Sequence, residues 1–159
     1  GLAVTGGPDR AAQRQQIEAT VARLQELAKA ALDQVRLPKG APLAADDRAK
    51  WEHVARDTVQ KEKYGAGQIL RLVVTSKVQT REKTEGVLRR TNTGATLTSY
   101  HYVWQEFSVT TAEKFGEEVW LWVNLLKFYE KSDGITPQGE WIVSRRFRST
   151  QILAGNLDG

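Results

Sequence analysis

The chain has 159 residues, a length typical of a single domain. Hydrophobic residues make up 40% and charged residues 26%, which is ordinary globular usage and excludes a wholly disordered chain. Cysteine is absent, which excludes disulfides, thiol nucleophiles and cysteine metal sites. No apolar run reaches the roughly 20 residues of a transmembrane helix. The formal net charge of +4 is too small to indicate nucleic acid as a partner by itself.

The chain begins Gly1-Leu2-Ala3 and contains no methionine, which predicts a trimmed or processed protein. A trimmed or processed protein can carry a signal peptide or membrane anchor ahead of the given residues, which favours a periplasmic or other extracytoplasmic location. We expect a flexible lead-in over residues 1–8, one α+β domain over 9–153 and a flexible tail over 154–159.

A long helix is predicted from about Pro8-Asp9 to the Leu37-Pro38 step, where proline disfavours helical geometry in the residue before it. Its apolar residues alternate in steps of four and three, and Leu27 and Leu32 widen the stripe; the stripe comprises Ile17, Val21, Leu24, Ala28, Ala31 and Val35. This pattern predicts packing on the core of the same chain. Over about three heptads it could also pair with a copy of itself or with a partner helix.

A second, shorter helix is predicted to start at Asp46 or Asp47, whose carboxylates can cap free backbone N–H groups. Its apolar face comprises Trp51, Val54, Ala55 and Val59. Gly65 and Gly67 should end it.

After Gly67 the apolar period changes to two, which is typical of strands with one face on a core. We predict a strand over residues 70–79, a turn over 82–85 and a short strand over 87–90. Asn92-Thr93-Gly94 should form a second turn. Three further strands are expected over about 96–110, 118–130 and 140–152.

These elements predict an α+β fold in which two N-terminal helices pack on a curved antiparallel sheet of about five strands. The connectors are too short for parallel crossovers, which need a dozen or more residues. The strand 120–128, followed by a turn and Gly139-Glu140-Trp141-Ile142-Val143-Ser144, resembles the closing hairpin of NTF2-like, cone-shaped α+β domains. A cystatin-like arrangement fits the same elements. NTF2-like domains include isomerases, ligand carriers, secretion-system components and assembly domains, so the resemblance implies a fold and leaves the function open.

Aromatic residues on three strands are the candidate ligand-binding residues. Tyr100, Tyr102 and Trp104 share one strand face, and Trp120 and Trp122 share a face of the next strand. Together with Trp141 they could line a pocket for an apolar or planar ligand. The alternatives are that these rings fill the core beneath the long helix, or that they form a protein interface.

Arginines on two strands form a candidate basic patch for phosphate groups, namely Arg89, Arg90, Arg146 and Arg148. The alternative is a solvated sheet face whose edges are protected by charge. Of the two histidines, His53 lies four residues before Asp57, a spacing that brings side chains together on a helix. That pair suits either a base oriented by a carboxylate or an ordinary surface contact.

No nucleophile motif, phosphate loop or metal-ligand cluster is present, so the sequence predicts no catalytic residue, metal or cofactor. The predicted function is that of a non-enzymatic protein-interaction or assembly domain, as the soluble part of an exported or membrane-tethered bacterial protein. A protein partner or self-association is expected. The alternatives are a small-ligand carrier or isomerase-like enzyme that uses the aromatic strands, and a binder of nucleic acid or anionic surfaces.

Overall fold

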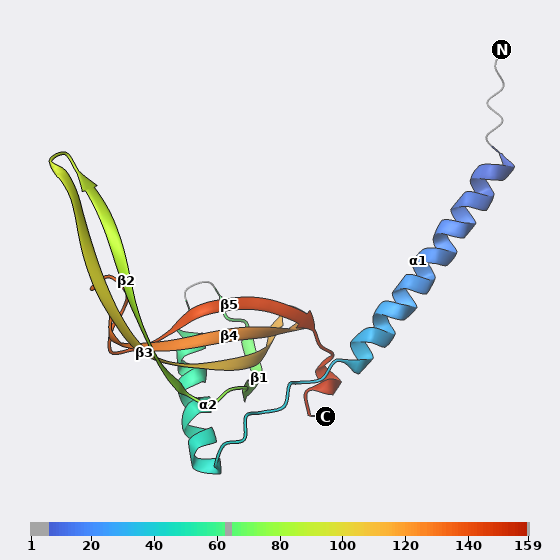
Figure 1. Cartoon of the computed structure of the whole chain (residues 1–159). Coiled ribbons are helices and arrows are strands. Elements are labelled where there is room, and N and C mark those ends of the chain that lie inside the picture. The colour runs from blue at the N-terminus through green and yellow to red at the C-terminus, as the bar shows by residue number, and fades with distance from the viewer. Residues whose placement is uncertain (1–6, 63–64, 159) are drawn as a thin grey trace. The chain divides into compact units, whose positions relative to one another are not determined.

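The computed structural model describes residues 7–62 and 65–158 and has the predicted α+β class (Figure 1). Two helices precede a five-stranded antiparallel sheet and a final short 3-10 helix. The helices are α1 (Pro8–Gln34), α2 (Ala45–Gln60) and η1 (Ala154–Asn156). The strands are β1 (Gln68–Val74), β2 (Gln79–Thr91), β3 (Gly94–Phe115), β4 (Glu118–Lys131) and β5 (Trp141–Gln151).

The long strand β3 organises the sheet. Its C-terminal half pairs with β1 on one side and with β4 on the other, and β5 continues the sheet beyond β4. Its N-terminal half pairs with β2. Residues that face each other across a ladder lie on the same face of the sheet, so the register fixes which side chains meet.

Helix α2 covers one face of this sheet. Phe107 of β3 and Trp141 of β5 contact Trp51 of the helix, with ring centroids 5.3 and 5.7 Å away. Ala55 of the helix is fully buried there. The other buried side chains of this core are Val74, Phe107, Val109 and Leu126. The carboxylates of Asp46 and Asp47 lie in the first turn of α2, where their negative charge interacts favourably with the positive end of the helix dipole. The N-cap residue is Ala44, so neither aspartate caps the helix.

The opposite face of the sheet is partly buried by the end of the chain. Ala112 and Leu121, which face each other across β3 and β4, are buried, and so is Ile152 after β5. The backbone N–H of Ile152 donates to the carbonyl of Val119 at 2.9 Å. The segment predicted as a flexible tail contains η1, and Asp158 forms an ion pair with Arg71.

The prediction of a turn over residues 82–85 is wrong. The chain turns earlier, between β1 and β2, and β2 then runs through these residues to Thr91. The polar run Arg-Glu-Lys-Thr-Glu has no apolar alternation because neither face of β2 lies on a core. The predicted turn at Asn92 and Thr93 is present, and it joins β2 to β3.

The chain divides into two compact units, residues 1–35 and 36–159, and the predicted single domain over 9–153 stays a prediction. The second unit contains α2, the sheet and all of the buried apolar side chains named above. The first unit contains α1. Residues 1–6 of the predicted lead-in lie outside the described residues. The predicted helix is therefore present, and the surface against which its apolar stripe packs stays a prediction.

Candidate functional site

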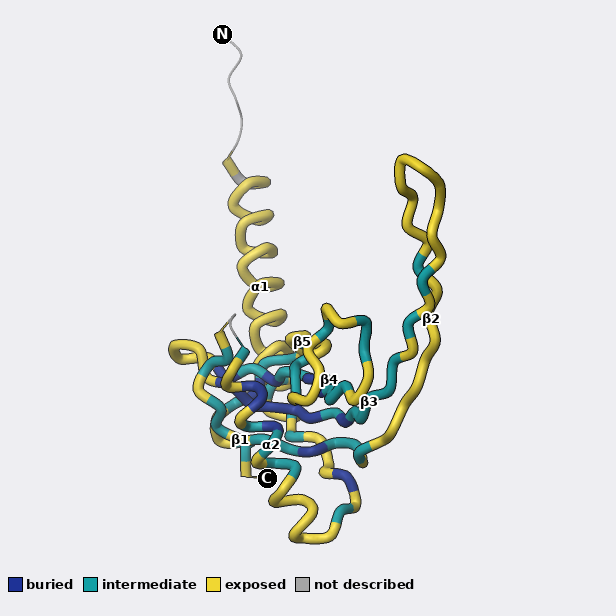
Figure 2. Tube along the Cα trace, turned by 90° about the vertical axis from the view of Figure 1, so that its left-hand side faces the viewer, coloured by how far each residue is buried: buried dark blue, intermediate teal, exposed yellow. Residues whose placement is uncertain are grey.

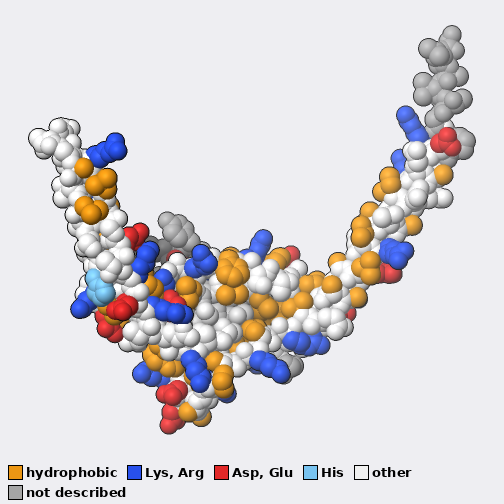
Figure 3. Space-filling view, in the orientation of Figure 1, with side chains coloured by type: hydrophobic (Ala, Val, Ile, Leu, Met, Phe, Trp, Pro, Cys, Tyr) orange, Lys and Arg blue, Asp and Glu red, His pale blue; other side chains and the backbone are white. Residues whose placement is uncertain are grey.

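The apolar stripe of α1 is exposed along its length. Ile17 is 63% exposed, Val21 46% and Leu24 59%, and Leu27 beside them is 57% exposed. Figure 2 shows the helix coloured as exposed, and Figure 3 shows hydrophobic side chains along it. Burial of such a side chain would contribute about 1.5–3 kcal/mol of free energy for each leucine, isoleucine or valine, and this contribution is absent while the side chain is in water. A contiguous exposed patch of this kind is a candidate interaction surface.

The helix forms because its composition favours helical backbone throughout. Most of its residues are alanine, leucine, glutamine, glutamate, arginine or lysine, which have high helix propensity. It is only weakly amphipathic, because alanines lie on all sides of it. Steps of four and three suit contact with another helix as well as contact with a sheet.

The hairpin formed by β2 and the first half of β3 is a second exposed element, and it projects from the sheet (Figure 1). Leu88 and Leu97 face each other across the two strands, and they are 58% and 71% exposed. This pair was not predicted from the sequence. The predicted turn at Asn92 and Thr93 would have revealed it, since a two-residue turn there sets Leu88 opposite Leu97.

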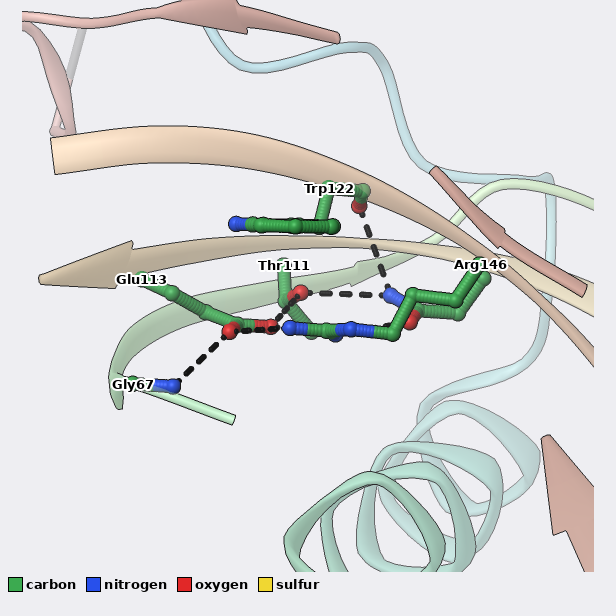
Figure 4. A network of polar contacts seen from close by, with 6 residues as sticks. Gly67, Thr111, Glu113, Trp122 and Arg146 are labelled. Carbon is green, nitrogen blue, oxygen red and sulfur yellow. Dashed lines mark hydrogen bonds and ion pairs between the residues drawn. The ribbon is translucent and has the colours of Figure 1, made fainter. Parts of the chain in front are cut away.

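A buried polar network lies on the helix-covered face of the sheet, at the end away from the aromatic core (Figure 4). Arg146 of β5 binds Glu113 of β3 through both terminal nitrogens, at 2.8 and 2.6 Å. The Glu113 side chain is completely buried and that of Arg146 is 12% exposed. Arg146 also donates to the Asn124 side-chain oxygen at 2.9 Å, and Asn124 donates to the Thr111 hydroxyl at 3.2 Å.

Two further hydrogen bonds hold the Glu113 carboxylate. The Thr111 hydroxyl donates to one carboxylate oxygen, and the backbone N–H of Gly67 donates to the other at 3.1 Å. Gly67 approaches so closely that a Cβ there would lie 2.6 Å from the Lys114 carbonyl. Every oxygen of Glu113 is thus occupied, and such a carboxylate suits the stabilisation of three strands rather than proton transfer to a ligand.

A shallow groove of about 380 Å³ adjoins this network, lined by Glu62, Trp122, Val143, Ser144, Arg145 and Arg146. The guanidinium of Arg146 stacks on the Trp122 ring at 4.2 Å. Among the described residues, the indole Nε1 of Trp122 is the one buried side-chain polar atom without a hydrogen-bond partner. Of the six aromatic residues predicted to bind a ligand, Trp122 lines this groove.

The six candidate aromatic residues do not form one pocket. Tyr100, Tyr102 and Trp104 belong to a cluster with Tyr129 at the base of the hairpin, with neighbouring centroids 5.8–6.5 Å apart. Trp141 packs in the core beside α2. Trp120 and Trp122 stack under Arg148 and Arg146. The sequence placed these residues on the right strands. Trp120 and Trp122, however, pair with Glu113 and Thr111 of β3, whose side chains point to the opposite face of the sheet from those of Tyr100, Tyr102 and Trp104.

Tyr102 in the hairpin-base cluster donates a hydrogen bond to Asp133 at 3.2 Å. Desolvation first, and this bond second, raise the pKa of Tyr102. The backbone N–H groups of Thr136 and Ile135 donate to the Asp133 carboxylate and lower its pKa to about 2. Asp133 therefore organises the loop between β4 and β5 as an anion over the physiological pH range.

The four arginines of the candidate basic patch lie in two places. Arg89 and Arg90 face Thr96 and Ala95 near the tip of the hairpin. Arg146 and Arg148 face Asn124 and Trp122 in the body of the sheet, and Arg146 is neutralised by Glu113. His53 lies 3.3 Å from Asp57 on α2, and both side chains are half exposed or more, which matches an ordinary surface contact. No group of three or more potential metal ligands occurs among the described residues.

Comparison with family models, curated proteins and solved structures finds no match to this chain. The resemblance to NTF2-like domains therefore stays a prediction. Within the described part of the chain, neither α1 nor α2 is long and apolar enough to cross a membrane.

Proposed function

We propose that this protein is an assembly domain and that α1 is the element through which it associates. The observation that supports the proposal is the exposed apolar row of Ile17, Val21, Leu24 and Leu27 on a 27-residue helix. A helix in water gains most of its stability from packing of its apolar face, and association would supply that packing.

The exposed hairpin is consistent with the same function. Its two strands pair only with each other over residues 86–99, so both of its edges offer unpaired backbone groups. Open edges with an exposed leucine pair are typical of arms that contact another chain. The hairpin is a secondary feature here because most of its side chains are polar.

The test compares three full-length proteins by sedimentation velocity and far-ultraviolet circular dichroism. In Leu24→Asp a carboxylate replaces a leucine on the apolar row. In Ala19→Asp the same carboxylate is placed on the opposite side of α1. We expect the wild type and Ala19→Asp to associate. Leu24→Asp should associate roughly tenfold to hundredfold more weakly, because a buried leucine contributes about 1.5–3 kcal/mol.

The helical signal in circular dichroism should change together with the mass of the complex in sedimentation. On dilution, both proteins should lose helical ellipticity, since helix formation is coupled to association. The Leu24→Asp protein should lose it at a higher protein concentration than the wild type. A wild type that stays monomeric at the highest soluble concentration would contradict the proposal. Equal weakening by Ala19→Asp would also contradict it, because the apolar row would then have no special part.

A further inference from the structure

The apolar row of α1 extends without interruption into two arginines. In steps of four and three, positions 10, 14, 17, 21, 24, 28 and 31 follow one another along the helix. We call this row the α1 seam; it comprises Arg10, Arg14, Ile17, Val21, Leu24, Ala28 and Ala31. The seam is thus basic at its N-terminal end, large and apolar in the middle, and small at its C-terminal end.

We propose that the α1 seam binds the α1 seam of a second copy of this chain, with the two helices antiparallel and a two-fold axis beside residues 22 and 23. The proposal rests on the assembly function above, and it adds the partner and the orientation. A two-fold axis makes the contact self-complementary, as in most homodimers.

Charge selects the antiparallel orientation. In a parallel pair, Arg14 would lie beside the partner's Arg14 and Arg10 beside the partner's Arg10, at the positive ends of both helix dipoles. In an antiparallel pair, each Arg14 lies beside the partner's C-terminal end, where the dipole is negative. The last turn of α1 carries no basic residue of its own, so the Arg14 of the partner meets no like charge in that turn.

Side-chain size is complementary in the same register. Ile17 faces the partner's Ala28, and Arg14 faces the partner's Ala31, so a large side chain meets a small one at each step away from the axis. Val21 and the partner's Leu24 meet at the axis. This alternation fills the space between two helices at an even separation.

The residues beside the seam bring no like charges together. Glu18 lies next to the partner's Gln25, and Gln13 lies next to the partner's Gln34, pairs that can form side-chain hydrogen bonds. The helix has four acidic and four basic side chains, so its net charge does not oppose self-association.

Disulfide cross-linking tests the orientation, and the absence of cysteine makes each introduced thiol unique. In the proposed pair, Arg14→Cys of one copy faces Ala31→Cys of the other. Two Ala31→Cys residues would instead lie about 26 Å apart, since 17 helical residues separate positions 14 and 31 at 1.5 Å each. A disulfide needs Cα atoms within about 7 Å.

We expect rapid oxidation of an equimolar mixture of Arg14→Cys and Ala31→Cys proteins to give a covalent dimer that contains one copy of each. Each variant alone should give at least tenfold less covalent dimer. A mixture of Arg14→Cys with Ala30→Cys is the matched control, because Ala30 lies on the outer side of the helix, and it should also cross-link poorly.

Several outcomes would overturn the proposal. Efficient cross-linking of Ala31→Cys with itself would show a parallel pair, and a trimer or larger species in sedimentation would exclude the two-fold axis. In both cases the assembly function would stand, provided that Leu24→Asp dissociates the complex. A monomeric wild type would contradict the assembly function and this pairing together.

Discussion

The buried ion pair of Arg146 and Glu113 shows how one residue can hold several strands. Arg146 of β5 reaches across Asn124 of β4 to Glu113 of β3, and Glu113 reaches the residue before β1. Replacing Arg146 by methionine would leave a fully buried carboxylate without its counter-ion. We expect Arg146→Met to lower the free energy of unfolding by about 3–5 kcal/mol, measured by urea denaturation.

The control for this prediction is Arg81→Met. Arg81 pairs with Glu106 at 3.2 Å, but the arginine side chain is 54% exposed, so its loss should cost less than about 1 kcal/mol. The double variant Arg146→Met with Glu113→Leu should recover part of the lost stability, because it removes the unpaired charge as well. Equal costs for the two single arginine substitutions would show that burial does not strengthen the Arg146 pair.

At the scale of elements, the hairpin of β2 and β3 has few of the contacts that stabilise the rest of the sheet. It is held by the ladder and by exposed pairs such as Arg81 with Glu106 and Thr84 with His101. A two-stranded hairpin without a covered face is marginally stable. In contrast, Phe107, Val109 and Thr111 lie in the buried half of the same strand β3.

We therefore expect amide hydrogen exchange to divide β3 into two parts. Amides of residues 95–101 and of β2 should exchange at least tenfold faster than those of residues 107–113, because local opening of the hairpin breaks no core. Peptide-level exchange followed by mass spectrometry measures this difference. Slow exchange throughout the hairpin would instead indicate that a second chain covers it in the assembled protein.

For the whole molecule, the sequence predicted the fold class and most elements because apolar period and turn residues carry that information. Helix α2 and strand β4 have clear periods, and the turn at Asn92 and Thr93 lies where expected. A turn was wrongly predicted within strand β2 because its exposed residues contact no core and show no apolar period. The pairing of Arg146 with Glu113 depends on the register of three strands, which local pattern does not specify.

The surface that packs against the apolar side of α1 is missing information of the same kind. Steps of four and three appear in a helix that packs on its own core and in a helix that packs on another chain. The pattern therefore predicted the helix and its apolar side correctly. The pattern does not distinguish the two uses, which the Leu24→Asp variant tests.

The division of the chain into two units predicts that residues 36–159 fold without α1. The buried apolar residues, from Ala41 to Ile152, all lie in the second unit, as do all five tryptophans. A protein of residues 36–159 should therefore fold, and its free energy of unfolding by tryptophan fluorescence should match that of the full chain within about 0.5 kcal/mol. If α1 is the assembly element, the shortened protein should also be monomeric under conditions in which the full chain associates.

The two readouts separate the contributions of the two units. A shortened protein with normal fluorescence and unchanged self-association would place the interface in residues 36–159, with the exposed leucine pair of the hairpin as the first surface to mutate. A shortened protein that fails to fold would show that the sheet needs α1, contrary to the core described here. Normal folding with loss of association is the result that links α1, and the seam it carries, to assembly.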